Sequence, residues 1–126
     1  MVRTWVLIGA LLGLTGVALG AFGAHGLDER LQANGRADTF ETAVRYHLIH
    51  AVALIAVGAL AFNTPSTAIQ LAGLLMTVGT LIFSGALYIL AIFDVRIMGA
   101  IAPIGGALMI AGWGALGWAA WTYQAP

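Results

Sequence analysis

The sequence predicts an all-α fold, an integral membrane bundle of four transmembrane helices that forms one domain over residues 1–126. Of these residues 61% are hydrophobic and only 8% are charged, and the mean hydropathy is +0.97. A soluble domain needs a larger polar shell than this. Long stretches without charge can each cross a hydrocarbon core of roughly 30 Å, where backbone without water must be helical. The helices are expected at residues 4–24, 39–62, 68–93 and 97–121.

The first helix follows Arg3, and its small residues near the end also resemble a secretory signal. The stretch is long enough to span the bilayer, so we expect it to be retained as a helix. Glycines recur along it at alternating spacings of four and three, at Gly9, Gly13, Gly16, Gly20 and Gly23. These spacings place the glycines on one stripe, where a second helix can approach closely. We favour a helix of the same chain as the occupant of this stripe.

A polar loop at residues 25–38 is expected to lead into the second helix. Asp38 stands three residues before Glu41 and directly ahead of an apolar run, which is the pattern of a helix N-cap with its capping partner. The second helix therefore starts near Thr39. Glu41 and Arg45 are four residues apart and can form an ion pair on its first turns.

Hydroxyl groups mark one face of the third helix, at Thr77, Ser84 and Tyr88. Hydroxyls at such spacings bond to carbonyls one turn earlier or reach across to another helix. The alternative is a polar path for a permeating solute, but few polar groups are present to line one. We therefore favour hydrogen bonds between helices.

The start of the fourth helix is irregular in sequence. Pro103 removes one helix hydrogen bond, and Gly105 and Gly106 loosen the following turn. Either the helix is kinked at Pro103, or Pro103 lies in its first turn and residues 94–102 form an apolar loop at the interface. Both alternatives place irregular backbone near the arginine-rich side.

The charges predict an orientation in the membrane. Four arginines lie in or beside the two loops that share one side, at Arg30, Arg36, Arg45 and Arg96. Only Arg3 lies on the side of the termini. The positive-inside rule then predicts an inner (cytoplasmic) membrane protein with the loop 25–38 in the cytoplasm and both termini outside. Aromatic residues on the terminal side are expected to form an anchoring belt, at Trp5, Trp118, Trp121 and Tyr123.

Hairpin topology also predicts a polar cluster at the boundary on the loop side. Its expected members are His25, Arg45, Tyr46, His47, His50, Asp94 and Arg96. We favour a structural role for this cluster, in which the histidines cap helix ends and bond to carboxylates. Binding of a quinone or a lipid headgroup is a second reading, and ligation of haem iron or a transition metal by His25, His47 and His50 is a third. Cysteine is absent, and no zinc spacing, phosphate-binding loop or nucleophile elbow occurs.

Four blocks of the sequence resemble a known family. They are "GAFGAHGL", "FETAVRYHLIHAVAL", "FSGALYILA" and "GAIAPIGGALMIAGW", and they are similar to the signature blocks of the small membrane proteins of domain of unknown function 423, which are related to transmembrane protein 256. The resemblance covers nearly the whole chain and implies four transmembrane helices. The positions that the family pattern emphasises are His25, Tyr46, His47, His50, Ser84, Gly85, Tyr88, Pro103, Gly105 and Gly106.

The function expected from these features is that of a non-catalytic accessory or scaffold protein, and no catalytic residue or cofactor is assigned. Its expected partners are membrane lipids or the helices of a homo-oligomer or a larger membrane complex. The alternative is a quinone-, haem- or metal-binding membrane protein that uses the boundary histidines. A small transporter is disfavoured because charge inside the spans is lacking. Nucleic acid is not expected as a partner, because the net charge is zero and no basic patch is present.

Overall fold

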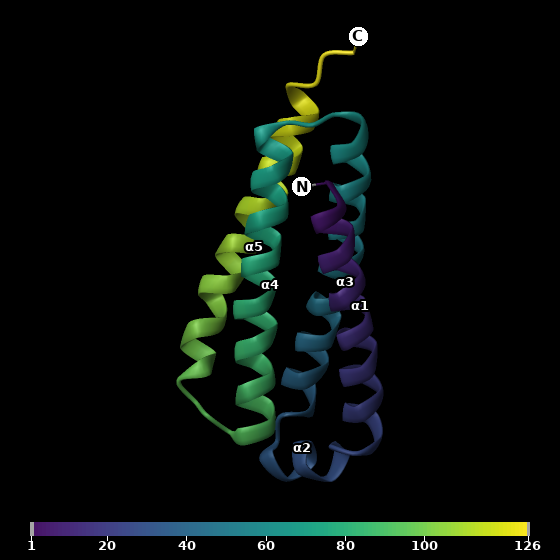
Figure 1. The fold of residues 1–126 in the computed structure, drawn as a ribbon. Helices are drawn as coiled ribbons and strands as arrows, with labels where there is room; N and C mark the ends of the chain where they lie inside the picture. Colours follow the sequence, from purple (N-terminus) through teal and green to yellow (C-terminus); the bar gives the residue numbers. More distant parts are fainter. Residues whose placement is uncertain (1, 126) are drawn as a thin grey trace.

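The computed structural model describes residues 2–125, and within this range the chain forms five helices and no strand. They are α1 (Val2–His25), α2 (Asp28–Asn34), α3 (Ala37–Asn63), α4 (Thr67–Phe93) and α5 (Met98–Trp121) (Figure 1). Four of them, all except α2, are long and apolar enough to cross a membrane. The predicted all-α fold with four spans is confirmed.

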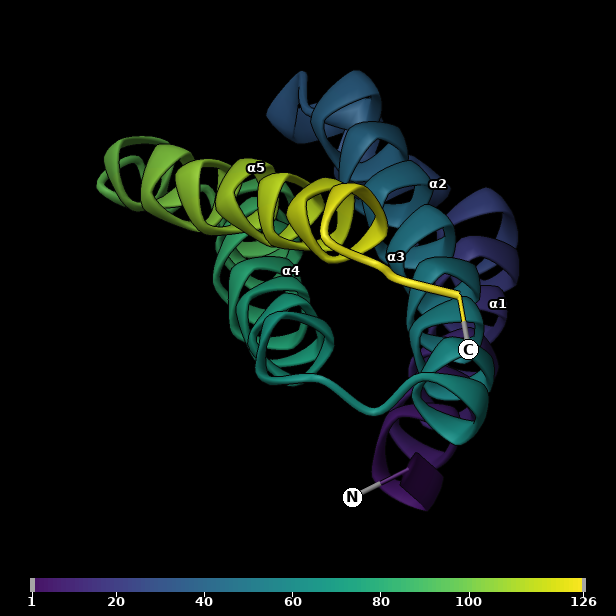
Figure 2. The same cartoon turned by 90° about the horizontal axis from the view of Figure 1, so that it is seen from above.

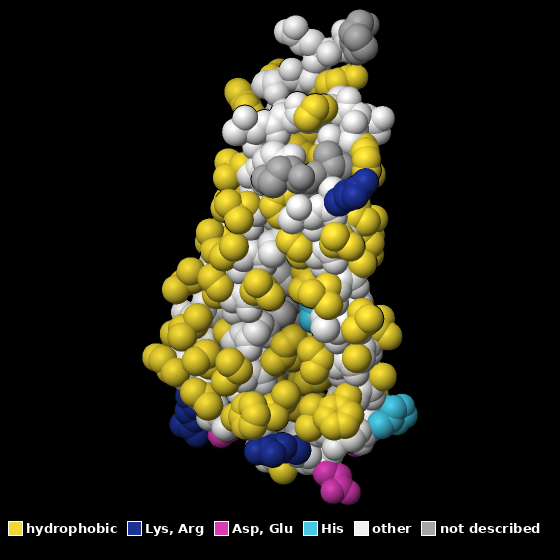
Figure 3. All heavy atoms as spheres, in the orientation of Figure 1, with side chains coloured by type: hydrophobic (Ala, Val, Ile, Leu, Met, Phe, Trp, Pro, Cys, Tyr) yellow, Lys and Arg dark blue, Asp and Glu magenta, His cyan; other side chains and the backbone are white. Residues whose placement is uncertain are grey.

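The helices form two pairs that meet along one seam. α1 packs against α3, α4 packs against α5, and contacts between α3 and α4 join the two pairs. Figure 2 shows the pairs from above, with α1 and α5 at the two ends of the arrangement. The face drawn in Figure 3 is largely hydrophobic along the helices, and most of its charged side chains gather at the α2 end. An apolar girdle with a polar end suits a protein whose solvent is the bilayer.

Glycines set how closely the paired helices approach. A Cβ added at Gly9 would lie 2.8 Å from the carbonyl oxygen of Ala51, and one at Gly16 would lie 2.7 Å from the side chain of Leu48. The glycine stripe of α1 therefore faces α3 of the same chain. Between α4 and α5, a Cβ at Gly105 would lie 2.6 Å from the carbonyl oxygen of Gly79. Both helix pairs thus rely on backbone-to-backbone contact.

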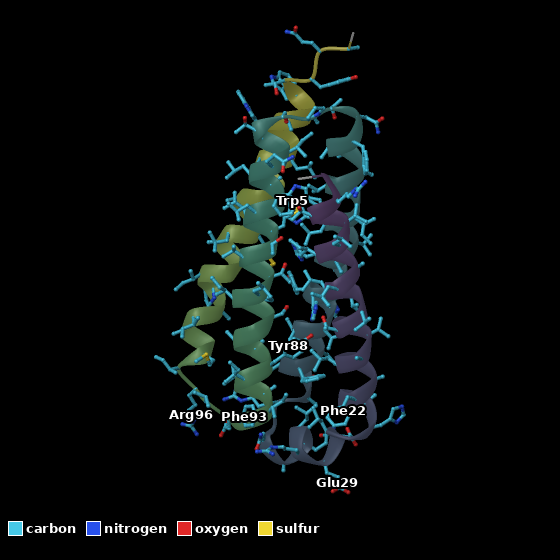
Figure 4. All side chains as sticks on the ribbon, in the orientation of Figure 1. Trp5, Phe22, Glu29, Tyr88, Phe93 and Arg96 are labelled. Carbon is cyan, nitrogen blue, oxygen red and sulfur yellow. The ribbon has the colours of Figure 1, made fainter. Side chains whose placement is uncertain are left out.

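Trp5 belongs to the interior rather than to an anchoring belt, so this part of the sequence prediction is wrong. Its side chain is only 5% exposed, and its indole N–H donates to Oε1 of Gln70 at 2.7 Å. The ring fits between α1 and α4 because Gly73 leaves room for it (Figure 4). Trp118 and Trp121, by contrast, are 63% and 84% exposed at the end of α5.

The segment predicted as a loop at residues 25–38 contains a helix, α2. Gly35 follows the last residue of α2 in the left-handed conformation with a φ of 64°, so that only Gly35 and Arg36 separate α2 from α3. The N–H of Phe40 then bonds to the carbonyl of Arg36 at 3.0 Å. Asp38 lies inside the first turn and makes no cap, which corrects its assignment as the N-cap. Its carboxylate still suits the positive end of the helix dipole.

α2 closes the C-terminal end of α4, whose last carbonyls have no partner within their own helix. Nε of Arg30 donates to the carbonyl of Ile92 at 2.8 Å, and Nδ2 of Asn34 donates to the carbonyl of Ala91 at 3.0 Å. Arg36 forms a salt bridge with Asp94 at 3.3 Å. No salt bridge joins the predicted pair of Glu41 and Arg45, both within the described residues.

α5 begins at Met98, so Pro103 lies in its second turn and not in its first. The alternative of an apolar loop over residues 94–102 is therefore wrong. Tight turns lead into the helix. In these turns the N–H groups of Met98, Gly99 and Ala100 each donate to the carbonyl oxygen three residues earlier. The ring of Pro103 is exposed on the outer surface of α5, where it does not disturb the packing against α4.

Candidate functional site

Polar bonds join the two helix pairs at several levels of the seam. Apolar side chains gain little by leaving lipid for one another, so hydrogen bonds and close packing supply much of the specificity between membrane helices. The bonds across the seam are Trp5–Gln70, His50–Trp113, Ala43–Ser84 and His47–Tyr88. The last of these belongs to a longer chain of polar groups and lies beside a cavity.

This polar chain runs from α1 through α3 to α4. Nε2 of His47 lies 3.2 Å from Oγ1 of Thr15, and Nδ1 lies 2.8 Å from the hydroxyl of Tyr88. The hydroxyl of Thr15 lies 2.9 Å from the carbonyl oxygen of Leu11. His47 is buried, whereas Thr15 and Tyr88 are half-buried. Three helices therefore contribute to one hydrogen-bonded chain.

The direction of these bonds follows from the chemistry of the groups. The Thr15 hydroxyl lies 2.9 Å from the carbonyl of Leu11 and 3.2 Å from that of Leu12, and because carbonyls only accept, we assign its single proton to the shorter of these contacts. Thr15 then accepts from Nε2–H of His47, and Nδ1 accepts from the hydroxyl of Tyr88. We assign His47 the neutral Nε2–H form on this basis. Every proton in the chain has an acceptor, and the hydroxyl oxygens of Thr15 and Tyr88 keep further lone pairs for a ligand.

A cavity of about 210 Å³ lies between α1 and α4, beside the hydrogen-bonded chain of Thr15, His47 and Tyr88. It is lined by Leu12, Thr15, Leu19, His47, Thr80, Leu81, Ser84, Gly85 and Tyr88. None of the lining side chains carries a carboxylate, an ammonium or a guanidinium group. Leu81 is 58% exposed, and nothing lies within 4 Å of a Cβ placed on Gly85. Figure 4 shows Tyr88 turned toward the space between α4 and α1. The cavity therefore offers neutral polar groups in an apolar frame that reaches the lipid-facing surface.

His50 belongs to a separate site on the other side of α3. Its Nε2 accepts from the indole N–H of Trp113 at 3.1 Å, and its Nδ1 lies 2.7 Å from the carbonyl of Tyr46. The Tyr46 ring stacks on the imidazole with a centroid distance of 6.2 Å and contacts Phe83 on α4. An indole only donates and a carbonyl only accepts, so His50 carries its proton on Nδ1. This site holds α5 against α3.

The structure does not gather the predicted boundary cluster into one site. His25 is exposed at the end of α1, Arg45 and Arg96 are exposed, and Asp94 pairs with Arg36. His47 and His50 lie about 15 and 20 Å along α3 from its first residue, at 1.5 Å per residue. Hairpin topology brings the ends of helices together. His47 and His50, however, lie several turns inside α3 and not at its end. They are therefore deeper in the bundle than the charged loops.

A centre of three histidine ligands does not fit this arrangement. Within residues 2–125 no group of three His, Cys, Asp or Glu side chains is placed to hold a metal ion. Both nitrogens of His47 and of His50 are already engaged in hydrogen bonds. A haem iron or a transition metal at either imidazole would have to replace one of these bonds.

Sequence reasoning missed Thr15 and Trp113 as partners of the two histidines. Thr15 is the lone hydroxyl residue between Val6 and His25, and a polar residue in so apolar a stretch is a signal for an interhelical bond. Trp113 carries the only polar side chain between residues 98 and 117. Neither signal specifies the partner, because the partner depends on how α1 and α5 are rotated about their axes.

Comparison with known proteins agrees with the predicted family resemblance. Residues 19–106 match the model of a family described as a protein of unknown function, DUF423. A UPF0382 membrane protein of Staphylococcus haemolyticus is 44% identical over 111 residues, which cover 88% of this chain and 89% of the relative. The UPF0382 membrane protein YwdK of Bacillus subtilis is 39% identical over 112 residues, which cover 88% of this chain and 90% of the relative. No solved structure matches the chain. This chain is therefore an integral membrane protein and belongs to the DUF423 family.

Proposed function

We propose that this protein is a non-catalytic accessory protein that binds a membrane lipid through the cavity between α1 and α4. The observation that carries the proposal is the hydrogen-bonded chain of Thr15, His47 and Tyr88 on the wall of a cavity that reaches the lipid-facing surface. Polar groups inside a membrane span are costly, and they often mark functional sites. When such groups lie beside an open cavity, they favour the binding of a ligand.

The cavity selects for chemistry and size. A volume of about 210 Å³ is smaller than the roughly 300–1,000 Å³ of pockets that enclose a whole drug-sized ligand. It therefore accepts one polar group of a lipid, while the acyl chain lies outside along Leu81 and the exposed surface of α1. The hydroxyl groups of the wall donate their protons within the protein and offer a ligand only oxygen lone pairs, so they suit a lipid hydroxyl that can donate to them. A phosphate would be buried here without a cation.

A quinone is the second candidate ligand. The Tyr88 hydroxyl lies 2.8 Å from Nδ1 of His47, and a quinone carbonyl would accept the Tyr88 proton in place of this nitrogen. The two candidates differ in the bond that they make, because a lipid hydroxyl donates to the wall of the cavity whereas a quinone carbonyl accepts from it.

Binding is tested with two probes in detergent micelles, the neutral lipid dioctanoylglycerol and the short-tailed decylubiquinone, each titrated against the purified protein. Gly85→Leu is expected to weaken binding of the accepted probe about tenfold or more, because the new side chain occupies the cavity. Tyr88→Phe is expected to weaken it about fivefold through the loss of one hydrogen bond.

Gly114→Leu is the matched control. A Cβ at Gly114 also meets nothing within 4 Å, but Gly114 lies on α5 and does not line the cavity. This variant should bind the probe as the wild type does. Failure of both probes to bind, or equal binding by the Gly85→Leu variant, contradicts the proposed site. Binding of decylubiquinone alone decides for the quinone.

We further propose that the protein lies in the inner (cytoplasmic) membrane with α2 on the cytoplasmic side and both termini outside. Arg30, Arg36, Arg45 and Arg96 support this orientation, because they lie at the α2 end or at the α4–α5 connection. Figure 4 shows Arg96 and Glu29 at this same end. Positive charge beside short loops is retained in the cytoplasm.

Single cysteines test the orientation, because the natural sequence has none. Glu29 and Tyr123 are both exposed and lie at opposite ends of the bundle. In intact spheroplasts, a membrane-impermeant maleimide is expected to label Tyr123→Cys and to leave Glu29→Cys unlabelled until the membrane is opened. The reverse labelling pattern would invert the orientation.

A further inference from the structure

We propose a second binding site, for a zwitterionic amino-phosphate headgroup such as that of phosphatidylethanolamine, in a pocket where α1, α2 and α3 meet. This boundary pocket has a volume of about 390 Å³. It is lined by Gly20, Gly23, Ala24, Asp28, Leu31, Gln32, Ala37, Phe40, Glu41, Val44 and Arg45. It shares no residue with the cavity between α1 and α4, so the inference goes beyond the proposed function.

Six of the charged groups at the α2 end form two sets. Arg30, Arg36 and Asp94 are engaged in bonds that close the end of α4. Asp28, Glu41 and Arg45 line the boundary pocket, and within the described residues their side chains make no hydrogen bond or salt bridge. Both charge signs are therefore present and unengaged around one pocket.

Apart from Gln32, the remaining wall of the boundary pocket is apolar and well packed. Leu31 and Phe40 are each only 3% exposed and pack together in a small core cluster. Gly23 lets the Phe40 ring lie directly against α1, where any Cβ would overlap it. The pocket thus has a rigid apolar floor with charges around it, at the end of a span where lipid headgroups lie.

The balance of charge identifies the ligand. Two carboxylates and one guanidinium surround the pocket, so an ammonium group is attracted by Asp28 and Glu41 while a phosphate is attracted by Arg45. A purely anionic headgroup would gain one attractive contact and meet two repulsive ones. A headgroup that carries both an ammonium and a phosphate group matches all three side chains.

The test compares three probes by titration of the purified full chain in detergent micelles: dioctanoyl phosphatidylethanolamine, dioctanoyl phosphatidylglycerol and free glycerophosphoethanolamine. The wild type is expected to bind the ethanolamine lipid about tenfold more tightly than the glycerol lipid. The double variant Asp28→Asn, Glu41→Gln should lose this preference. Arg45→Gln should weaken binding of both lipids, because both carry the phosphate.

Glu29→Gln is the matched control, since Glu29 is an exposed carboxylate of α2 that does not line the boundary pocket. It should keep the wild-type preference, and so should Gly85→Leu, which blocks only the other cavity. Equal binding of the two lipids by the wild type, or a preference that survives in the double variant, overturns the proposal. Weak binding of free glycerophosphoethanolamine identifies a lipid as the ligand, whereas binding as tight as that of the lipid identifies a soluble amino-phosphate.

Discussion

Gly105→Ala is expected to lower the free energy of unfolding by about 1–3 kcal/mol, because it places a methyl group between two backbones. A Cβ at Gly105 would lie 2.6 Å from the carbonyl oxygen of Gly79 and 2.8 Å from Cα of Phe83. Backbone atoms in helices cannot rotate away as a side-chain end can. α4 and α5 would therefore have to separate along their whole contact, which is the largest between any two helices of the described chain.

Gly114→Ala is the control, because it adds the same methyl group to the same helix at a position where no neighbouring atom is close. Nothing lies within 4 Å of its added Cβ, so this variant should be neutral or gain up to about 1 kcal/mol from better helix propensity. Unfolding of both variants by SDS titration in mixed micelles, followed by circular dichroism, measures the difference. Equal stability of the two would show that α4 and α5 do not pack at Gly105.

Leu54→Ala is expected to cost about 2–5 kcal/mol, because Leu54 is completely buried where α1, α3 and α4 meet. The neighbouring side chains include Val57 and Met76, which are also completely buried. These side chains are held by helices on several sides and cannot collapse into the space that a smaller residue leaves. The same SDS titration measures the loss.

Leu60→Ala is its control on the same helix. Leu60 is 44% exposed, so its removal takes away lipid contact rather than core packing. Its effect should stay below about 1 kcal/mol. If both leucine variants lost the same stability, the rotation of α3 about its axis would have to differ from that described here.

The sequence predicted the features of the fold that depend on transfer of a segment from water into lipid. The lack of charge over four long stretches is enough to place those stretches in lipid, since the cost of exposed backbone and buried charge there is large. The helices observed at α3 and α4 accordingly begin and end within two residues of the predicted positions. The gathering of arginines at one end follows from hairpin topology alone.

The interior contacts were less predictable. Trp5 has the sequence position of an interfacial anchor, yet Gly73 and Gln70 on α4 give it a buried place and a partner. His47 and His50 stand three residues apart and yet bond to opposite sides, one to Tyr88 and the other to Trp113. Hydropathy does not report which face of an apolar helix points inward, because lipid and protein interior are equally apolar.

The sequence by itself thus determined the all-α class, the number of helices that can span a membrane, and the gathering of most arginines at one end of the bundle. Only the tertiary structure decided that α2 closes the end of α4, that the glycine stripe faces α3, and that Thr15, His47 and Tyr88 meet beside a cavity. The physical reason is the range of the interactions. Transfer into lipid acts on each stretch separately, whereas hydrogen bonds and close packing act within a few ångströms and depend on how each helix is rotated against its neighbours.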